Sequence, residues 1–189
     1  MAAAVALGIP LSGIGAIYPH NTWLQVGPVA LLLPVAIVAL RRWPLSNASA
    51  LCITLFVLLH LFAARWSYSF VPYREWLGTL DTGRNMFDRL VHFLFGLLAV
   101  LPFAEIAIRY RGRVPKSALI GAIGFVLAVG GLYEIFEWSL TMAMAPADAG
   151  AYNGEQGDRF DSQKDMAVAA LGALIALLPA AWQLRRISR

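Results

Sequence analysis

Apolar residues run along this chain in long stretches that are separated by short polar segments. A helix that crosses a bilayer needs about 20 apolar residues, with about 17 as the practical minimum. The pattern therefore predicts an all-α fold, a polytopic membrane helix bundle with about six transmembrane helices, and one integral membrane domain over residues 1–189. The stretches that meet the length requirement are 2–18, 24–40, 47–64, 86–108, 116–140 and 162–184.

The first two stretches are short and contain Pro10, Pro28 and Pro34. A proline inside a helix removes a backbone donor, which a membrane tolerates only where neighbouring groups satisfy the freed carbonyls. We therefore expect these segments to be kinked or partly re-entrant. The first stretch lacks a positively charged region and a convincing small-x-small cleavage site, so we interpret it as a retained helix and not a signal peptide.

Composition supports the bilayer as the solvent of this chain. Hydrophobic residues make up 59% and charged residues 14%, against about 45–50% and about 25% in ordinary soluble domains. The net charge of +4 does not indicate a nucleic-acid partner, because the basic residues lie at the ends of apolar runs. The single cysteine, Cys52, excludes an intramolecular disulfide. Composition leaves the oligomeric state undetermined.

Basic residues gather at one end of the predicted bundle. Short basic loops mark the cytoplasmic side of a membrane protein, so we expect both termini to be cytoplasmic. Residues 65–85 and 141–161 are then two longer outer loops. The nine basic residues on the cytoplasmic side are Arg41, Arg42, Arg109, Arg111, Arg113, Lys116, Arg185, Arg186 and Arg189.

The acidic residues show the opposite distribution. Of eleven acids, ten map to the outer half or the outer loops, and Glu105 alone lies near the basic side. The ten are Glu75, Asp81, Asp88, Glu134, Glu137, Asp148, Glu155, Asp158, Asp161 and Asp165.

Several of these acids recur at helical spacing, and residues three or four apart share one helix face. A carboxylate within a membrane span costs about 2.5–3.5 kcal/mol, so such acids usually line a cavity or pair with a partner. We predict that they converge around one outward-opening cavity. The residues concerned are Asp88 with His92, Glu134 with Glu137, the series Asp158, Asp161 and Asp165, and His60 near the outer end of its stretch.

Carboxylates at one depth repel unless a cation lies between them. That cation could be Arg89, Arg159, Lys164, a proton or a metal ion. Carboxylate oxygens with an imidazole suit zinc, manganese, magnesium or calcium, so we predict a divalent cation of unknown identity. The predicted ligands are Asp88, His92, Asp158, Asp161 and Asp165, the predicted catalytic residues are Glu134 and Glu137, and further candidates are His60, Arg89 and Lys164.

Purely structural roles stay open for part of this set. An aspartate at a helix start can cap the helix, where the dipole favours negative charge. Asp88 with Arg89, and Asp161 or Asp165 with Lys164, can form interfacial ion pairs, and His60 can be a packing residue. Glu134 and Glu137 lie inside an apolar helix, where no cap is needed, which favours a polar network or a site.

Three motifs in this order resemble the YjdF-type bacterial inner-membrane proteins: NMFDRLVHF at 85–93, YEIFEW at 133–138 and QGDRFDSQKDM at 156–166. The resemblance covers about 85–175, and Phe160 stands where that pattern favours Trp. It implies a location in the bacterial cytoplasmic (inner) membrane.

A more distant pattern, D-x-x-x-H, E-x-x-[QE] and D-x-x-x-D-x(6)-G, is similar to VanZ-like proteins, which are linked to glycopeptide resistance. This chain has Arg89 where that pattern often has Lys, Glu137 where it has Gln, and Ala169 where it has Asn. Neither family carries a settled mechanism. The resemblances therefore imply the membrane class and the site residues, not a reaction.

These residues admit three functions. We favour a metal-dependent hydrolase acting at the outer leaflet on a lipid-linked or envelope substrate, with Glu134 or Glu137 as general base. The alternatives are an ion- or proton-coupled transporter that uses the same acids, and a non-catalytic membrane factor whose polar network fixes helix packing. Glu105 is almost the only polar group in the inner halves of the spans, which favours a one-sided site over a carrier.

Overall fold

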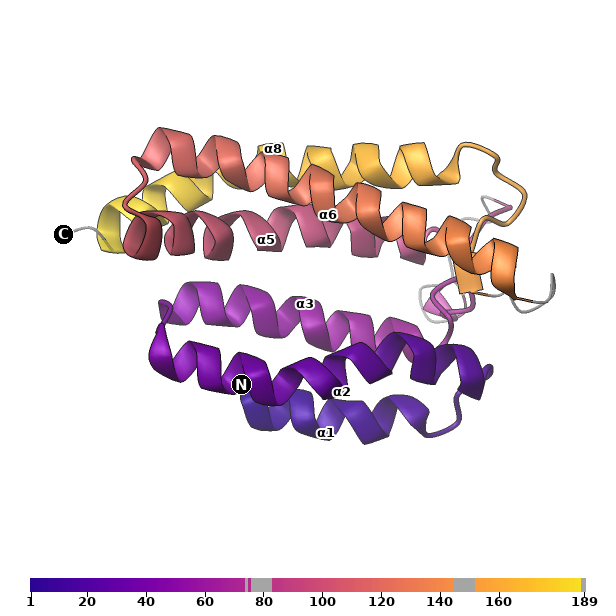
Figure 1. Cartoon of the computed structure of the whole chain (residues 1–189). Coiled ribbons are helices and arrows are strands. Elements are labelled where there is room, and N and C mark those ends of the chain that lie inside the picture. The colour runs from indigo at the N-terminus through magenta and orange to yellow at the C-terminus, as the bar shows by residue number, and fades with distance from the viewer. Residues whose placement is uncertain (74, 76–82, 145–151, 188–189) are drawn as a thin grey trace.

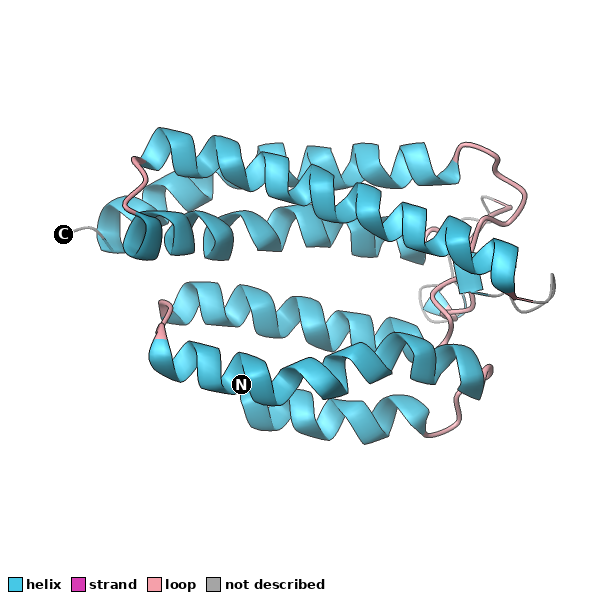
Figure 2. Ribbon diagram, viewed as in Figure 1, coloured by secondary structure: helices cyan, strands magenta, loops and turns pink. Residues whose placement is uncertain are grey.

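The computed structural model describes residues 1–73, 75, 83–144 and 152–187, and within them the chain is built from helices and connecting loops (Figures 1 and 2). The predicted all-α class is confirmed. Parts of both predicted outer loops lie outside the described residues. The main helices are α1 (Ala2–Gly13), α2 (Pro19–Arg42), α3 (Asn47–Arg65), α5 (Phe87–Arg111), α6 (Pro115–Ala143) and α8 (Asp161–Ile187).

Five of these helices are long and apolar enough to cross a membrane, and α1 is the exception. Its 12 residues rise about 18 Å, against a hydrocarbon core of about 30 Å. The second predicted stretch is longer than expected, because α2 begins at Pro19 and runs for 24 residues. Proline suits the first position of a helix, where its missing N–H is not needed. Of the six predicted spans, α1 is therefore the one that is too short to cross the bilayer.

Local chemistry sets the helix ends at the basic side of the bundle. The Ser46 side chain accepts a hydrogen bond from the Ser49 backbone N–H and caps the start of α3. Gly112 ends α5 with a φ of 61°, a left-handed conformation that glycine adopts without steric cost. Pro115 then opens α6 at its first turn.

The helices form two groups of three that lie side by side (Figure 1). In the first group, α1, α2 and α3 pack around Val5, Val26, Leu61 and Ala64. In the second, α5, α6 and α8 pack around a core made mostly of alanine and valine. The groups join where α3 packs against α5. Large apolar side chains elsewhere point outward, as Leu31 does with 78% of its surface exposed, as expected for a lipid-facing helix.

Close contact between α5 and α8 positions the polar residues at the other end of the bundle. A Cβ atom built on Gly96 would collide with the carbonyl oxygen of Ala169, and one on Gly172 with the carbonyl oxygen of Phe93. Small residues allow two helix backbones to touch in this way. The contact holds the start of α5 beside the start of α8, where the acidic motifs lie.

Glu105 fastens the two groups together at the basic end. Its side chain is fully buried and accepts hydrogen bonds from the Ser46 backbone N–H and hydroxyl, both at 2.7 Å, and from the Ser49 hydroxyl at 2.5 Å. Arg109 donates to it at 2.7 Å. Glu105 thus has a complete set of partners at the basic end and fixes α3 on α5.

Candidate metal centre and its ion-pair network

Three predicted site residues meet at the end of the bundle away from the basic helix ends. Asp88 and His92 come from the first turns of α5, and Asp165 comes from the second turn of α8. Each offers one ligand atom, and these atoms all lie within 4.8 Å of one another. The three side chains are buried, with exposed fractions of 8%, 9% and 2%.

Glu134 adds a carboxylate from α6. Its Oε1 atom lies 3.7 Å from Nε2 of His92, and Oδ1 of Asp88 lies 3.8 Å from the same nitrogen. Both separations exceed the length of a hydrogen bond. Oε1 of Glu134 and Oδ1 of Asp165 are buried and accept no hydrogen bond, which is costly for acceptor oxygens removed from water. Nε of Arg89 lies 3.7 Å from this Asp165 oxygen, within the distance of an ion pair.

These separations are compatible with a shared cation. Zinc binds nitrogen and oxygen ligands at about 2.0–2.2 Å in a tetrahedral arrangement, so two of its ligand atoms lie about 3.3–3.6 Å apart. Calcium, at about 2.3–2.6 Å and with more flexible geometry, allows up to about 5 Å. The distances from His92 Nε2 to Asp88 and Glu134, 3.8 and 3.7 Å, exceed the zinc separations and fall within the calcium limit. The donor set therefore fits a divalent ion that accepts oxygen ligands and one imidazole.

The other two predicted ligands, Asp158 and Asp161, take part in ion pairs at the rim of the cluster. Arg89 Nη2 lies 2.7 Å from Asp158 and 3.1 Å from Asp161. Arg84 pairs with Asp161, and Lys164 donates to Asp158 at 2.6 Å. Lys164 thus pairs with Asp158, whereas the sequence suggested Asp161 or Asp165. These bonds from Lys164 and Arg89 hold the pKa of the Asp158 carboxyl well below its usual range.

Arg84 belongs to the ion-pair network around the cluster, although it lies outside the sequence motifs. Besides Asp161, it donates to the backbone carbonyls of Glu155 at 2.5 Å and Gly154 at 3.3 Å. It therefore ties the segment before α8 to the segment before α5. The sequence feature that could have pointed to Arg84 is its position immediately before the 85–93 motif, in a part of the chain where acidic residues are in excess.

The second predicted catalytic residue, Glu137, lies one turn further along α6 and is half-buried. It interacts electrostatically with Asp88 and Glu134, and its backbone carbonyl accepts a hydrogen bond from Asn153 at 3.2 Å. It therefore borders the cluster, while Glu134 contacts it.

His60 lies apart from the cluster, on α3. Its Nε2 is 3.1 Å from the carbonyl oxygen of Gln25, and its Nδ1 bonds the hydroxyl of Tyr68. A carbonyl oxygen only accepts, so Nε2 carries the proton and Nδ1 accepts from the tyrosine. Burial raises the pKa of Tyr68 well above its usual value, so the hydroxyl keeps the proton that it donates. A cavity of about 260 Å³ is lined by both His60 and His92.

These features define a polytopic helical membrane protein with a buried Asp–His cluster at one end of its bundle. The chain belongs to the family described as "Predicted membrane protein (DUF2238)", which it matches over residues 1–186. It is similar to the "Inner membrane protein YjdF" of Escherichia coli (strain K12), with 34% identity over 175 residues, or 88% of this chain and 80% of the relative. The predicted YjdF-type membership is confirmed. No solved structure matches the chain.

Proposed function

We propose that this protein is a metal-dependent hydrolase of the bacterial inner membrane, acting on a lipid-linked or envelope substrate. Asp88, His92 and Asp165 would hold the divalent cation. The observation that carries the proposal is the convergence of Asp88, His92 and Asp165, whose ligand atoms lie within 4.8 Å of one another, beside the buried Oε1 of Glu134, which accepts no hydrogen bond. Buried polar atoms in proteins are almost always satisfied, and a cation among these side chains would give Glu134 Oε1 a partner, whereas Asp165 Oδ1 already lies 3.7 Å from Nε of Arg89.

The charge of the cluster supports the same proposal. Six carboxylates gather at this end, and three basic side chains pair with them. Carboxylates removed from water require neutralisation, or their charged forms become too costly. Asp165 lies 3.7 Å from Nε of Arg89, while Asp88 and Glu134 have His92 as their nearest basic group, so a small ion beside His92 would add the positive charge that these two carboxylates lack. The carboxylates are Asp88, Glu134, Glu137, Asp158, Asp161 and Asp165, and the bases are Arg84, Arg89 and Lys164.

The residues divide into distinct roles. A bound divalent cation supplies a Lewis acid that polarises the scissile carbonyl or phosphoryl group. Glu134, which contacts His92 from the neighbouring helix, takes the proton from the attacking water as general base. Glu137 borders the site one turn further along α6. Arg84 and Arg89 hold Asp158 and Asp161 at the rim and keep the starts of α5 and α8 together.

The orientation belongs to the proposal. The relative from Escherichia coli is an inner membrane protein by name, and eight basic residues of the described chain, Arg41, Arg42, Arg109, Arg111, Arg113, Lys116, Arg185 and Arg186, lie at the end opposite the cluster. By the positive-inside rule that end faces the cytoplasm. The cluster then faces outward, where lipid-linked and envelope substrates are found, and both termini are cytoplasmic.

A non-catalytic role is the second candidate, and the arginine pairs favour it. Arg84, Arg89 and Lys164 already neutralise Asp158 and part of the neighbouring charge, so the network has a structural function whether or not an ion binds. Transport is less well supported by the arrangement. The inner half of the second helix group has an apolar core, and Glu105 has a full set of partners.

Metal analysis of the purified protein, followed by thermal unfolding, tests the proposal. A ligand that binds only the folded state stabilises it by about 2.7 kcal/mol at a hundred times its dissociation constant. We expect chelator to lower the melting temperature of the wild type and one of Zn²⁺, Mn²⁺, Mg²⁺ or Ca²⁺ to restore it. Asp165→Asn should abolish the response, and Asp158→Asn, a matched change at the rim, should keep it. Absence of metal together with an unresponsive transition would reassign the acids to the arginine network.

A further inference from the structure

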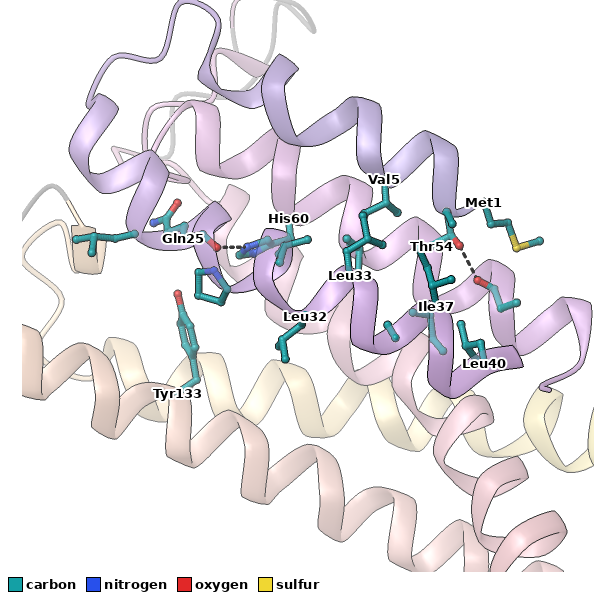
Figure 3. A pocket seen from close by; sticks show the side chains of 18 of the residues that line it. Met1, Val5, Gln25, Leu32, Leu33, Ile37, Leu40, Thr54, His60 and Tyr133 are labelled. Carbon is teal, nitrogen blue, oxygen red and sulfur yellow. Dashed lines mark hydrogen bonds between the residues drawn. The ribbon is translucent and has the colours of Figure 1, made fainter. Parts of the chain in front are cut away.

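An apolar groove of about 470 Å³ runs along α2 and α3 and ends near the polar cluster. Figure 3 shows Leu32, Leu33, Ile37 and Leu40 spread along it, with Tyr133 at one end. Fifteen residues separate Gln25 from Leu40 on α2, which is about 22 Å at a rise of about 1.5 Å per residue. The groove is therefore longer than one leaflet of hydrocarbon, about half of a 30 Å core.

Polar groups gather at one end of this groove. Gln25, His60 and Tyr133 lie together there, and the hydrogen bond from His60 to the Gln25 carbonyl is drawn in Figure 3. Tyr152 also lines the groove. These residues belong to the outer half of the bundle, and the aliphatic side chains follow toward the basic end. The groove thus has the polarity of an amphipathic molecule aligned with the bilayer normal.

The groove and the cavity beside the candidate metal centre are neighbours that share part of their walls. Val29, Val57, His60 and Tyr133 line both spaces, and His92 lines the cavity only. His92 is also a member of the polar cluster. The shared side chains thus place the groove on α2 beside the cavity that reaches the proposed cation.

We propose that this groove holds one hydrocarbon chain of a membrane lipid whose polar head reaches the Asp88–His92–Asp165 cluster. This inference rests on the proposed function and names the substrate class as an amphipathic lipid that enters sideways from the bilayer. His60 and Tyr133 lie where the hydrocarbon chain of the lipid would meet its head group. Their hydrogen-bonding tips and apolar rings suit a position where a lipid changes from hydrocarbon to polar groups.

Two physical points favour a lipid over a second protein in this groove. Its volume is in the range of about 300–1,000 Å³ that small-molecule sites occupy. A hydrocarbon chain gains no free energy when it moves from the bilayer into an equally apolar groove. The free energy that keeps a lipid in the groove must therefore come from its head group. The charged cluster lies beyond the polar end of the groove, with His92 in the neighbouring cavity, and a phosphate bound to a cation there would supply that attraction.

Lipid retention tests the inference. The full-length chain is released from nanodiscs of phosphatidylethanolamine and phosphatidylglycerol, and native mass spectrometry measures the bound phospholipid. We expect the wild type to retain one phospholipid, and Val29→Trp, which fills the shared segment, to reduce retention about tenfold, equivalent to about 1.4 kcal/mol. Leu31→Trp is the matched control, since that neighbouring residue is 78% exposed and does not line the groove. Val57→Phe carries the test if Val29→Trp does not fold.

A photoreactive group in the acyl chain of phosphatidylglycerol locates the lipid. Crosslinks to Leu33, Ile37 and Tyr133 that Val29→Trp removes would support the inference. Equal retention by the wild type and both filling variants, or crosslinks between two copies of the chain across the groove, would overturn it. Metal binding is measured in the same samples. If the protein contains metal but retains no lipid, only the proposed lipid binding in the groove is contradicted. If it retains lipid but contains no metal, only the proposed hydrolase function is contradicted.

Discussion

Nε2 of His92 on α5 lies 3.7 Å from Oε1 of Glu134 on α6, and no hydrogen bond joins them. The two residues are 42 positions apart and belong to different motifs. Their approach places an imidazole nitrogen and an unpaired carboxylate oxygen at the same point of the buried cluster. Under the proposed function, the divalent cation would bind between these two groups.

Glu134→Gln should separate the cost of the unpaired charge from the benefit of a bound ion. In chelator, the variant should melt above the wild type, because an amide removes a buried charge, and relieving an unsatisfied buried group is worth about 1–3 kcal/mol. With saturating metal, the difference should shrink or reverse. Paired melting curves with and without chelator measure this. A variant less stable than the wild type in chelator would show that Glu134 already has a favourable partner.

Gly96→Ala and Gly172→Ala should each destabilise the protein, because the new Cβ meets a carbonyl oxygen of the facing helix. Overpacking of this kind typically costs about 1–3 kcal/mol, and about 1 kcal/mol lowers a melting temperature by about 2–4 °C in a chain of this length. Any rise in melting temperature on adding a divalent ion should also become smaller, since α5 and α8 carry the three proposed ligands. Gly124→Ala is the control, because a Cβ atom at that position would have no neighbour within 4 Å, and it should be neutral.

Glu105→Ala should loosen the attachment of α3 to α5. The substitution leaves the Ser46 N–H and the Ser49 hydroxyl without their buried acceptor. Hydrogen bonds to a charged group are worth about 1.5–3 kcal/mol, so a loss of at least that size is expected in unfolding measurements. Arg109→Gln should cost less, because its side chain is 40% exposed and the serine bonds persist. Similar losses in both variants would show that the arginine is the dominant partner.

Stability should depend on pH through Asp158, which lies outside the spans. Its folded-state pKa is lowered by hydrogen bonds from Lys164 and Arg89. The resulting stabilisation is present above the unfolded value of about 3.9 and is lost as pH falls through the folded value. The melting temperature of Asp158→Asn should therefore lie below that of the wild type at pH 6, and the gap should narrow below about pH 4. A gap that stays constant across this range would exclude the ion pairs as its source.

The membrane orientation is open to cysteine labelling in a Cys52→Ala background. Val114→Cys, in the basic connection between α5 and α6, should be protected from an impermeant reagent added to intact cells. Glu155→Cys, beside the acidic cluster, should react. Both positions are exposed, so access to the reagent depends on the side of the membrane. The reverse pattern would place the cluster in the cytoplasm and remove the proposed access to envelope substrates.

Much of the fold follows from local pattern. Long apolar runs predict the helices, and the basic residues mark one end of the bundle, because hydropathy and charge act on each segment separately. The length of α1 did not follow from this pattern. Its apolar run continues to residue 18, but the helix ends at Gly13 and the chain turns back at Pro19 to start α2. A hydropathy pattern does not report where a chain reverses inside an apolar run.

The sequence by itself determined that Asp88 and His92, and likewise Glu134 and Glu137, share a helix face, since the period of an α-helix is a local property. Only the tertiary structure decided which acids are paired. Asp158 and Asp165 are seven residues apart and both lie near Arg89, yet the first accepts hydrogen bonds from Lys164 and Arg89 while the second, at 3.7 Å from Arg89, is buried with Asp88 and His92. That division depends on the depth at which α5 and α8 meet, which their backbone contact at Gly96 sets. Contacts between distant helices are decided by packing, and spacing along one helix carries no record of them.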